Sequence, residues 1–589
     1  MNARRTVSAL AAESAFLSAL AISSFLLPVL AAAQSSADDP TIFLNQAWSQ
    51  DDRDWYYHFS QGAAVVSYDI FLNLEVADSQ ELFRSDANSE RYGLITQPPG
   101  SPYNPDGLPI GISKTVISTP QWRGEETGEF AGVTCAMCHE EQLNYKGKHV
   151  RIDGGVANTL DLQAYIQALN AAMRATLTDA AKFDRLAARL GTTSTGAKAK
   201  LRERFTQQAA ATAEYATRSA ATLWPWGPSR LDALSMINNR LTANLPGIPE
   251  NTSTPIAPVK PPFLWNAPQG LWTQWSAIIQ DPLARNLGET MGVYMPINLT
   301  ARSPAEGLFA ANAAISELDR VERQLERLAP PNWPENVFGK IDRVKAKAGK
   351  AQFVELCASC HNAWPYRWTE ANKYGKRFIL VGLVPQSYVG TDHTQAEAIR
   401  PFAVTGGLSD KLPGLRGKEV VSMLEFKTSL QREILERAIA NLRPTPAEEI
   451  ELNGYRELPQ PPASDRVYKA APRDGVWATP PFLHNGSVPT LYDLLLPASE
   501  RPKKFCTGRE FDPVKVGLDT SGRSGSFTFD TALLGNSNAG HSFQAGPLGS
   551  GVIGPLLTDD QRWDLVEYLK SIPETPGRVT PFGGPPAGQ

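Results

Sequence analysis

Two copies of the pattern Cys-x-x-Cys-His constrain this chain more than any other feature. They occupy residues 135–139 and 357–361 and use four of the five cysteines. The pattern is the attachment signature of c-type haem. Two thiols three residues apart on one turn can bond to the two vinyl groups of a haem, and the following histidine reaches the iron from the same face. Two Cys-x-x-Cys knuckles around a structural zinc ion are the alternative. A histidine directly after both pairs favours haem, so the sequence predicts two covalently bound haem c groups with their iron.

Each motif assigns three residues to its cofactor, with the cysteines forming thioether bonds and the histidine acting as the proximal iron ligand. The residues expected to bind the two haems are, in chain order, Cys135, Cys138, His139, Cys357, Cys360 and His361. The fifth cysteine, Cys506, has no partner left in the chain. It is interpreted as a small buried thiol, with a reactive thiol as the alternative.

The N-terminus predicts an export signal over residues 1–33. Arg4 and Arg5 supply positive charge, residues 16–30 form an apolar run, and three alanines at 31–33 suit a cleavage site. A membrane anchor is the alternative, but the run is short for a span and is interrupted by serines and a proline. We therefore expect a periplasmic or secreted protein that does not span a membrane after signal removal. The net charge of −4 gives no basic field for nucleic acid.

The fold class is predicted to be mainly α, with long loops and few short strands. The 46 prolines and 45 glycines of this 589-residue chain imply long irregular connections. Helical periodicity runs over 160–190, 303–328 (with Ser303 as N-cap) and 426–442, and Thr558 heads a terminal helix.

Two cytochrome c-like haem domains are expected. Prolines at 330, 331 and 334 mark the boundary between an N-terminal domain over 34–330, with the active-site haem and loop extensions, and a C-terminal domain over 331–589, with an electron-transfer haem. The terminal helix is expected to pack against the helix that leads to the second motif.

The sixth iron ligands decide the chemistry, because a closed iron passes electrons whereas an open one binds O2 or peroxide. After Met423 the chain has no methionine, and its only later histidines are His484 and His541. His541 lies in the loop 535–541 ahead of the terminal helix, so we predict that it ligates the second iron and makes that haem bis-histidine. His484 is expected to be a loop-fixing or supporting residue. For the first iron, His58, His149 and the helical methionines are poor candidates, and an open distal face is predicted.

A tryptophan-rich stretch over 265–275 precedes the run 281–289, which mixes polar and apolar residues. The tryptophans either pack in the core or line a haem pocket or the space between the haems.

These motifs together resemble the di-haem cytochrome c peroxidase superfamily. The segments 475–491, 535–541 and 282–289 look more specifically like its oxygenase branch, which includes rubber oxygenases and bacterial fatty-acid dioxygenases that act on oleate. The resemblance covers most of residues 130–572. It implies that the N-terminal haem binds oxygen in an apolar pocket without a protein ligand, and that the C-terminal haem is bis-histidine and transfers electrons. It also places a tryptophan near or between the haems and the run 282–289 near the distal side of the first. The residues that we therefore expect at the catalytic site are Trp272, Trp275, Arg285, Asn286, Leu287 and Glu289.

Three functions compete on the sequence alone. The favoured one is a dioxygenase that adds O2 to an unsaturated fatty acid or polyisoprene in a dry apolar pocket. The second is a peroxidase that reduces H2O2, for which Arg285 and Glu289 are candidate polar groups. The third is an electron carrier, which the size of the chain disfavours. An electron-donor protein is an expected partner.

Overall fold

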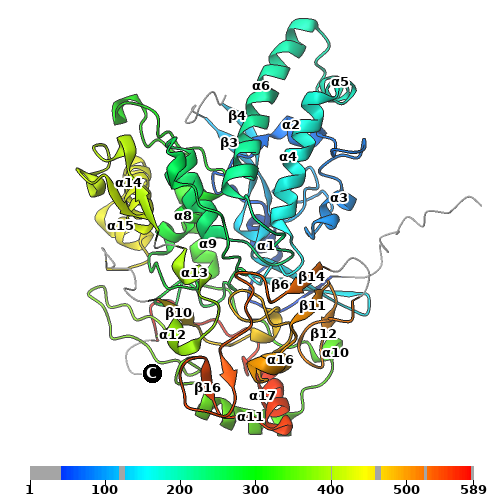
Figure 1. Cartoon of the computed structure of the whole chain (residues 1–589), viewed down its shortest axis with the longest axis vertical. Coiled ribbons are helices and arrows are strands. Elements are labelled where there is room, and N and C mark those ends of the chain that lie inside the picture. The colour runs from blue at the N-terminus through cyan, green and yellow to red at the C-terminus, as the bar shows by residue number, and fades with distance from the viewer. Residues whose placement is uncertain (1–40, 119–126, 399–400, 458–465, 523–526, 586–589) are drawn as a thin grey trace, which may run out of the picture. The chain divides into compact units, whose positions relative to one another are not determined.

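The computed structural model describes residues 41–118, 127–398, 401–457, 466–522 and 527–585 (Figure 1). Residues 40–589 form one compact unit, and the predicted export signal lies outside the described residues. Helices take up 38% of the chain and strands 15%. No described strand is longer than six residues. The prediction that helix predominates and that the strands are short is therefore confirmed, but the described strands, β1 to β16, are not few.

The α-helices fall along the whole length of the described chain. In the first half they are α1 Gln50–His58, α2 Tyr68–Asn73, α3 Asp86–Arg91, α4 Leu162–Thr178, α5 Ala180–Arg189, α6 Thr195–Glu214, α7 Ala233–Asn238, α8 Pro282–Gly292 and α9 Ile315–Leu325. In the second half they are α10 Glu335–Phe338, α11 Arg343–Leu356, α12 Gln386–Val389, α13 Thr394–Glu397, α14 Met423–Leu442, α15 Pro446–Leu452, α16 Leu491–Leu494 and α17 Asp559–Ser571. None of the helices in the described ranges has the length and apolar character needed to cross a membrane.

Within the described ranges, the strands form two three-stranded sheets and five two-stranded pairs. One sheet has the order β2 (Val66–Ser67), β4 (Gly128–Val133), β3 (Ile112–Ile117), and the other has the order β1 (Ile42–Phe43), β6 (Lys148–Asp153), β5 (Glu140–Tyr145). The pairs are β7 (Gly382–Pro385) with β10 (Val467–Ala470), β8 (Phe402–Val404) with β9 (Val420–Ser422), β11 (Lys504–Thr507) with β14 (Phe527–Asp530), β12 (Phe511–Asp512) with β13 (Gly517–Leu518), and β15 (Ser542–Phe543) with β16 (Val552–Gly554). The first Cys-x-x-Cys-His motif connects β4 to β5, so strands hold both of its ends.

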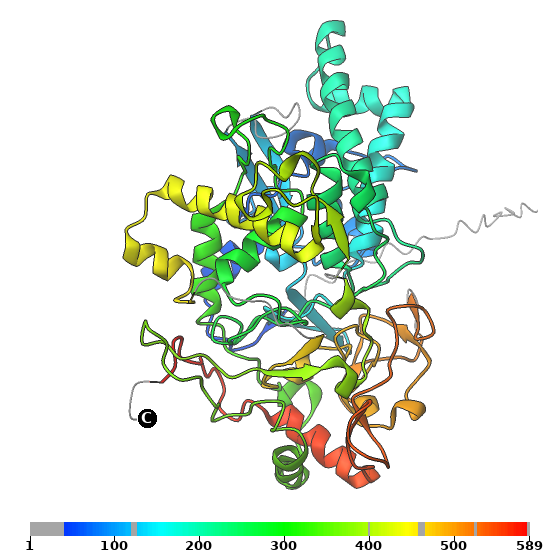
Figure 2. The ribbon, with the colours of Figure 1, turned by 60° about the vertical axis from the view of Figure 1, so that its left-hand side comes forward.

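The terminal helix α17 packs along α11, as expected, and the two helices lie side by side in both views (Figures 1 and 2). Thr558 and Gln561 form the predicted capping box at its start. The close approach depends on Gly349, because a Cβ there would lie 2.0 Å from the carbonyl oxygen of Asp564. Phe353 and Tyr568 bring their ring centres to 5.2 Å, and burying such rings stabilises the contact by about 2 kcal/mol each. Since α11 ends at the second motif, this packing fixes where Cys357 lies.

Two predicted helices are shorter than their periodicity indicated. The helix expected over 303–328 begins only at Ile315, after a short 3₁₀ turn at Pro304–Glu306. The chain turns between them at Gly307 and Phe309, which have φ of 93° and 67°, and a positive φ cannot continue a right-handed helix. The helix expected over 160–190 is interrupted at Asp179, whose carboxylate accepts from the backbone N–H of Ala181 and starts α5.

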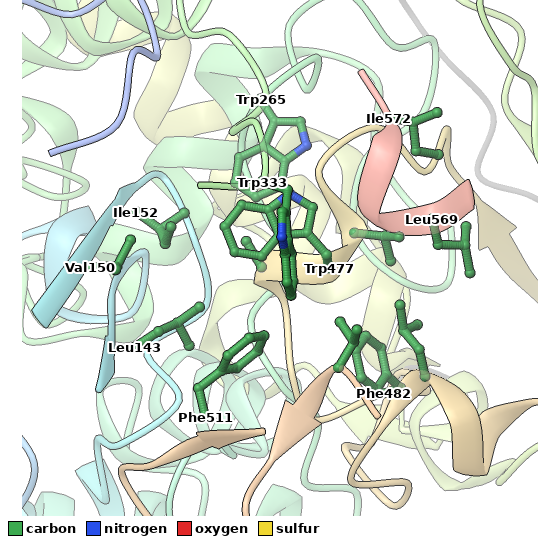
Figure 3. Close-up of a cluster of buried hydrophobic side chains, with 14 of the residues drawn as sticks. Leu143, Val150, Ile152, Trp265, Trp333, Trp477, Phe482, Phe511, Leu569 and Ile572 are labelled. Carbon is green, nitrogen blue, oxygen red and sulfur yellow. The ribbon is translucent and has the colours of Figure 1, made fainter. Parts of the chain in front are cut away.

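The largest hydrophobic core joins residues from both halves of the chain (Figure 3). Trp265 and Val150 from the first half lie in the same cluster as Trp333, Trp477 and α17. Trp333 and Trp477 meet edge to face, with ring centres 5.3 Å apart. The hydrophobic core is therefore continuous across the expected boundary at residue 330. The division into two haem domains at that point stays a prediction.

Candidate haem centres

The first motif lies on a tight turn between two strands. The hydroxyl of Thr134 accepts from the backbone N–H of Ala136 and starts a 3₁₀ turn, and the N–H of His139 donates to the carbonyl of Cys135 at 3.0 Å. Gly111 lies directly against this turn with φ of 92°, and a Cβ there would lie 2.4 Å from the Cα of Met137. Only glycine leaves the turn room to pack so closely.

A buried polar network supports the strand that follows His139. The hydroxyl of Tyr57 lies 3.0 Å from a carboxylate oxygen of Glu140 and 3.1 Å from one of Asp153, and Arg53 donates to Asp153 at 2.7 Å. Burial raises the pKa of Glu140 well above its usual range, and the nearby Asp153 raises it further. The network pins β5 against β6 and α1, and so holds the histidine in place.

Cys135, Cys138 and His139 line one cavity of about 220 Å³. Most of its wall is apolar and includes Val65, Phe71, Leu162, Ile166, Leu169, Met236, Ile237, Phe263, Val293 and Leu325. The described cysteines form no disulfide, so both motif thiols are available for thioether bonds. Burial lowers the pKa of His139 to about 4, which leaves the imidazole neutral at pH 7 with a lone pair for a metal.

Helix α8 supplies several polar residues of the same wall. Its residues Arg285, Asn286 and Glu289 line the cavity beside the motif cysteines. Arg285 pairs with the buried Glu322, and the Asn286 side-chain amide donates to that carboxylate at 2.7 Å. The side-chain amide of Gln274 donates to Glu289 at 2.5 Å. Burial raises the pKa of Glu289.

The structure corrects the expected position of Leu287. It is fully buried in a different hydrophobic cluster, together with Leu283 and Met291, and does not line the cavity. On a helix with 3.6 residues per turn, positions 283, 287 and 291 share the face opposite to 285 and 289. The apolar wall near the first motif therefore comes from other elements.

Two of the tryptophans in 265–275 lie where the cavity meets a smaller one. Trp275 lines both cavities, whereas Trp272 lines only the smaller cavity, of about 30 Å³. Trp265 belongs to the large core and also borders the smaller cavity. The smaller cavity extends to Arg473, whose Nε lies 3.0 Å from Nδ1 of His361 in the second motif. The tryptophan-rich stretch therefore lies between the two motifs.

The second motif follows α11, and Cys357 is the C-cap residue of this helix. Within the motif, the backbone N–H of His361 donates to the carbonyl of Cys357 at 2.8 Å. Nδ1 of His361 is 3.0 Å from the carbonyl of Ala471. Arg473 Nε, which can only donate, lies 3.0 Å from the same Nδ1, so both contacts of the ring use Nδ1 and Nε2 is the nitrogen that remains for a metal. The rings of His361 and His541 face each other with centres 6.2 Å apart. An imidazole nitrogen bonds a metal at about 2 Å and the ring centre lies about 1 Å behind it, so two imidazoles on opposite sides of one ion have centres about 6 Å apart. The spacing fits a bis-histidine site.

The loop that carries His541 is held by a buried arginine. The guanidinium of Arg501 donates to the carbonyls of Asn538, Gly540 and His541 at 2.7, 2.8 and 2.7 Å. Gly540 has φ of 69°, and a Cβ there would lie 2.2 Å from the backbone of Gly390. Burial lowers the pKa of His541 to about 3, and the positive charge of Arg501 adds to the effect. This imidazole is therefore also neutral and free to act as a ligand.

His484 lies elsewhere. Its ring stacks on Tyr468 with centres 4.2 Å apart, and its carbonyl accepts from the backbone N–H of Lys260. It therefore has the loop-fixing position expected for it.

Several residues of these centres were not singled out from the sequence. Gln274 stands inside the tryptophan-rich stretch, but nothing in the pattern links it to Glu289. Arg501, Arg473 and Lys469 are isolated cations in loops or short strands. Only the folded chain brings them to the two motifs.

The two motifs, the cavity beside the first and the facing histidines at the second define a cytochrome c-like haem oxidoreductase. A family model described as "RoxA-like, cytochrome c-like" matches residues 467–506, the segment from β10 into β11. The chain is 36% identical over 576 residues to "Uncharacterized protein y4iJ" of Sinorhizobium fredii (strain NBRC 101917 / NGR234), which covers 91% of this chain and 94% of the relative. It is 26% identical over 340 residues to "Uncharacterized protein y4iM" of the same organism, covering 53% and 63%. The chain belongs to the family of y4iJ.

Proposed function

We propose that the chain is an exported di-haem c-type dioxygenase that adds O2 to an unsaturated fatty acid or a polyisoprene at the first motif. The observation that carries the proposal is the cavity beside Cys135, Cys138 and His139. Among the described residues that line it, His139 is the only histidine, and the wall is mainly apolar. Such a wall suits the haem macrocycle itself, and the part of the cavity that the macrocycle leaves open would take a hydrocarbon chain and exclude water. The match to a RoxA-like domain agrees with this class of reaction.

The two motifs have different proposed roles. When bound, haem c supplies the redox-active iron at each motif. At the first motif, Cys135 and Cys138 attach the cofactor, His139 holds its iron, and the apolar residues orient the substrate. At the second motif, His361 and His541 would hold the iron from the protein side. That centre transfers electrons, and an electron-donor protein outside the cell membrane is its proposed partner.

A peroxidase is the second candidate, and one observation favours it. Glu289 lines the cavity of the first motif, is held by Gln274, and has a pKa raised by burial. A buried carboxyl group of raised pKa suits general acid–base cleavage of a peroxide. The two candidates therefore differ in what they require of Glu289.

We expect the purified protein to consume O2 in an oxygen electrode when oleate or polyisoprene latex is added, without reductant or peroxide. Glu289→Gln is expected to change that rate by less than about twofold, because the dioxygenase reaction needs no general base in its first step, whereas general acid–base work contributes about 100-fold or more.

Replacing the apolar cavity residue Val293 by Phe is expected to reduce the rate of O2 uptake or shift the product position, because the larger side chain narrows the space for the substrate.

Met236→Leu is the matched control for these two variants, because Met236 lines the same cavity. Among the described lining residues, it is the one methionine outside the motif. Its optical spectrum is expected to equal that of the unmodified protein. Absence of O2 uptake with both substrates, together with H2O2 turnover that falls about 100-fold or more in Glu289→Gln, would assign the protein as a peroxidase.

A further inference from the structure

Three cationic side chains line the cavities beside the two motifs; Lys260 is buried, whereas Lys469 and Arg473 are partly exposed. Lys260 lines the cavity of the first motif, Lys469 on β10 lines both this cavity and the smaller one, and Arg473 lines the smaller one next to His361. Among the residues that line both cavities, Lys469 is the only one with a charge. Segment 469–473 therefore spans the distance from one motif to the other.

None of these three cations forms an ion pair with a carboxylate of the described residues. No carboxylate oxygen of the described residues lies within 4.0 Å of the charged nitrogens of Lys260, Lys469 or Arg473. The charges that act on the Lys469 ammonium are Arg285 and Arg473, which are themselves cations. Lys260 has one bond, from Nζ to the carbonyl of Thr479 at 2.5 Å.

An unpaired buried ammonium is expensive in free energy, and like charges nearby add to the penalty. Burial lowers the pKa of Lys469 to about 7, and the neighbouring cations lower it further. Burial also lowers the pKa of Lys260 to about 7 and that of Arg473 to about 10. The charge of Glu141 offsets part of this cost for Lys260, whereas only cations act on Lys469, so the surroundings of Lys469 fit an anionic group that arrives with a ligand.

Haem c brings such groups, because each macrocycle carries two carboxylate side chains at the edge away from its thioether bonds. We propose that segment 469–473 is a carboxylate-binding strip shared by the two cofactors, in which Lys469 holds a propionate of the haem at the first motif and Arg473 one of the haem at the second. The inference rests on the proposed di-haem function. It adds a cofactor-binding role for β10. The family match covers this strand but assigns no role to any of its residues.

The strip has an electrostatic consequence. A cation beside a haem carboxylate favours the reduced cofactor, because it offsets negative charge near the iron. Removing the Lys469 charge is therefore expected to lower the reduction potential of the haem at the first motif more than that of the other haem. A packing role for Lys469 would produce no such difference.

The experiment compares Lys469→Met, which keeps the length of the side chain but removes its charge, with Lys469→Arg, which keeps the charge. Lys504→Met is the control, since Lys504 is also a strand lysine but its side chain is 66% exposed. Each purified holoprotein is titrated spectroelectrochemically, and its haem content is measured. We expect a lower potential for the first haem in Lys469→Met and unchanged potentials in Lys469→Arg and Lys504→Met.

A lower content of covalently attached haem in Lys469→Met but not in Lys469→Arg would also support the strip, because haem attachment would then depend on the charge. Unchanged potentials in a Lys469→Met protein that keeps both haems would overturn it. So would equal shifts or equal haem loss in the Met and Arg variants. These readouts are independent of substrate, so a protein without O2 uptake but with the expected shift would contradict only the proposed reaction.

Discussion

A protein in which Cys135 and Cys138 are both replaced by alanine is expected to carry one covalently bound haem instead of two. The two thiols line the cavity of the first motif and belong to no disulfide in the described chain. Without them no thioether bond can form there, and the remaining His139–metal bond does not survive denaturation. The pyridine haemochrome assay on denatured protein measures the number of attached haems directly.

The matched control is Cys506→Ala, which removes the cysteine outside both motifs. Cys506 lies on β11, paired with Thr528 of β14, away from both centres. This variant is expected to keep two haems. A count that stays at two in the Cys135→Ala, Cys138→Ala protein would refute the attachment site, and a count of one in the unmodified protein would refute the di-haem assignment.

Replacing His541 by alanine is expected to convert one haem from low-spin to high-spin while both haems stay attached. The 6.2 Å between the ring centres of His361 and His541 suits two imidazoles on one iron. Removing one of them opens the sixth position, and loss of the second strong-field nitrogen lowers the ligand field and changes the reduction potential. Electron paramagnetic resonance and visible spectra of the ferric protein distinguish the two states.

His484→Ala is the comparison for this variant, because His484 is the other histidine after Met423. Its ring stacks on Tyr468 instead of facing His361, so the spin states are expected to remain unchanged. The assignment of the sixth ligand is wrong if His484→Ala produces the high-spin haem and His541→Ala does not.

The parts of the molecule that could be predicted from sequence are those in which short-range spacing determines geometry. Cys-x-x-Cys-His places its three ligating side chains together on one turn, whatever surrounds it. The capping box at Thr558 lies within a single turn and is confirmed. His541 could be proposed by elimination, because so few histidines and methionines follow the second motif. That proposal agrees with the facing rings in the structure.

The parts that could not be predicted depend on contacts between distant segments. Leu287 and Glu289 are two residues apart, yet one lies in a core cluster and the other in the cavity wall. The position of α14 against α8 decides which face of the helix becomes core. Lys469 looks like an ordinary strand lysine until β10 is placed between the motifs. The start of α9 depends on positive φ at Gly307 and at Phe309, a residue type that rarely adopts it.

An isotope experiment decides between oxygenase and peroxidase chemistry. The purified protein is incubated with oleate, and separately with polyisoprene, under ¹⁸O₂ without peroxide or reductant, and the products are analysed by mass spectrometry. A dioxygenase at the first motif predicts that both atoms of one O2 molecule appear in the product. Products without ¹⁸O, or no product from either substrate while H2O2 is turned over in a reaction that requires Glu289, would contradict it.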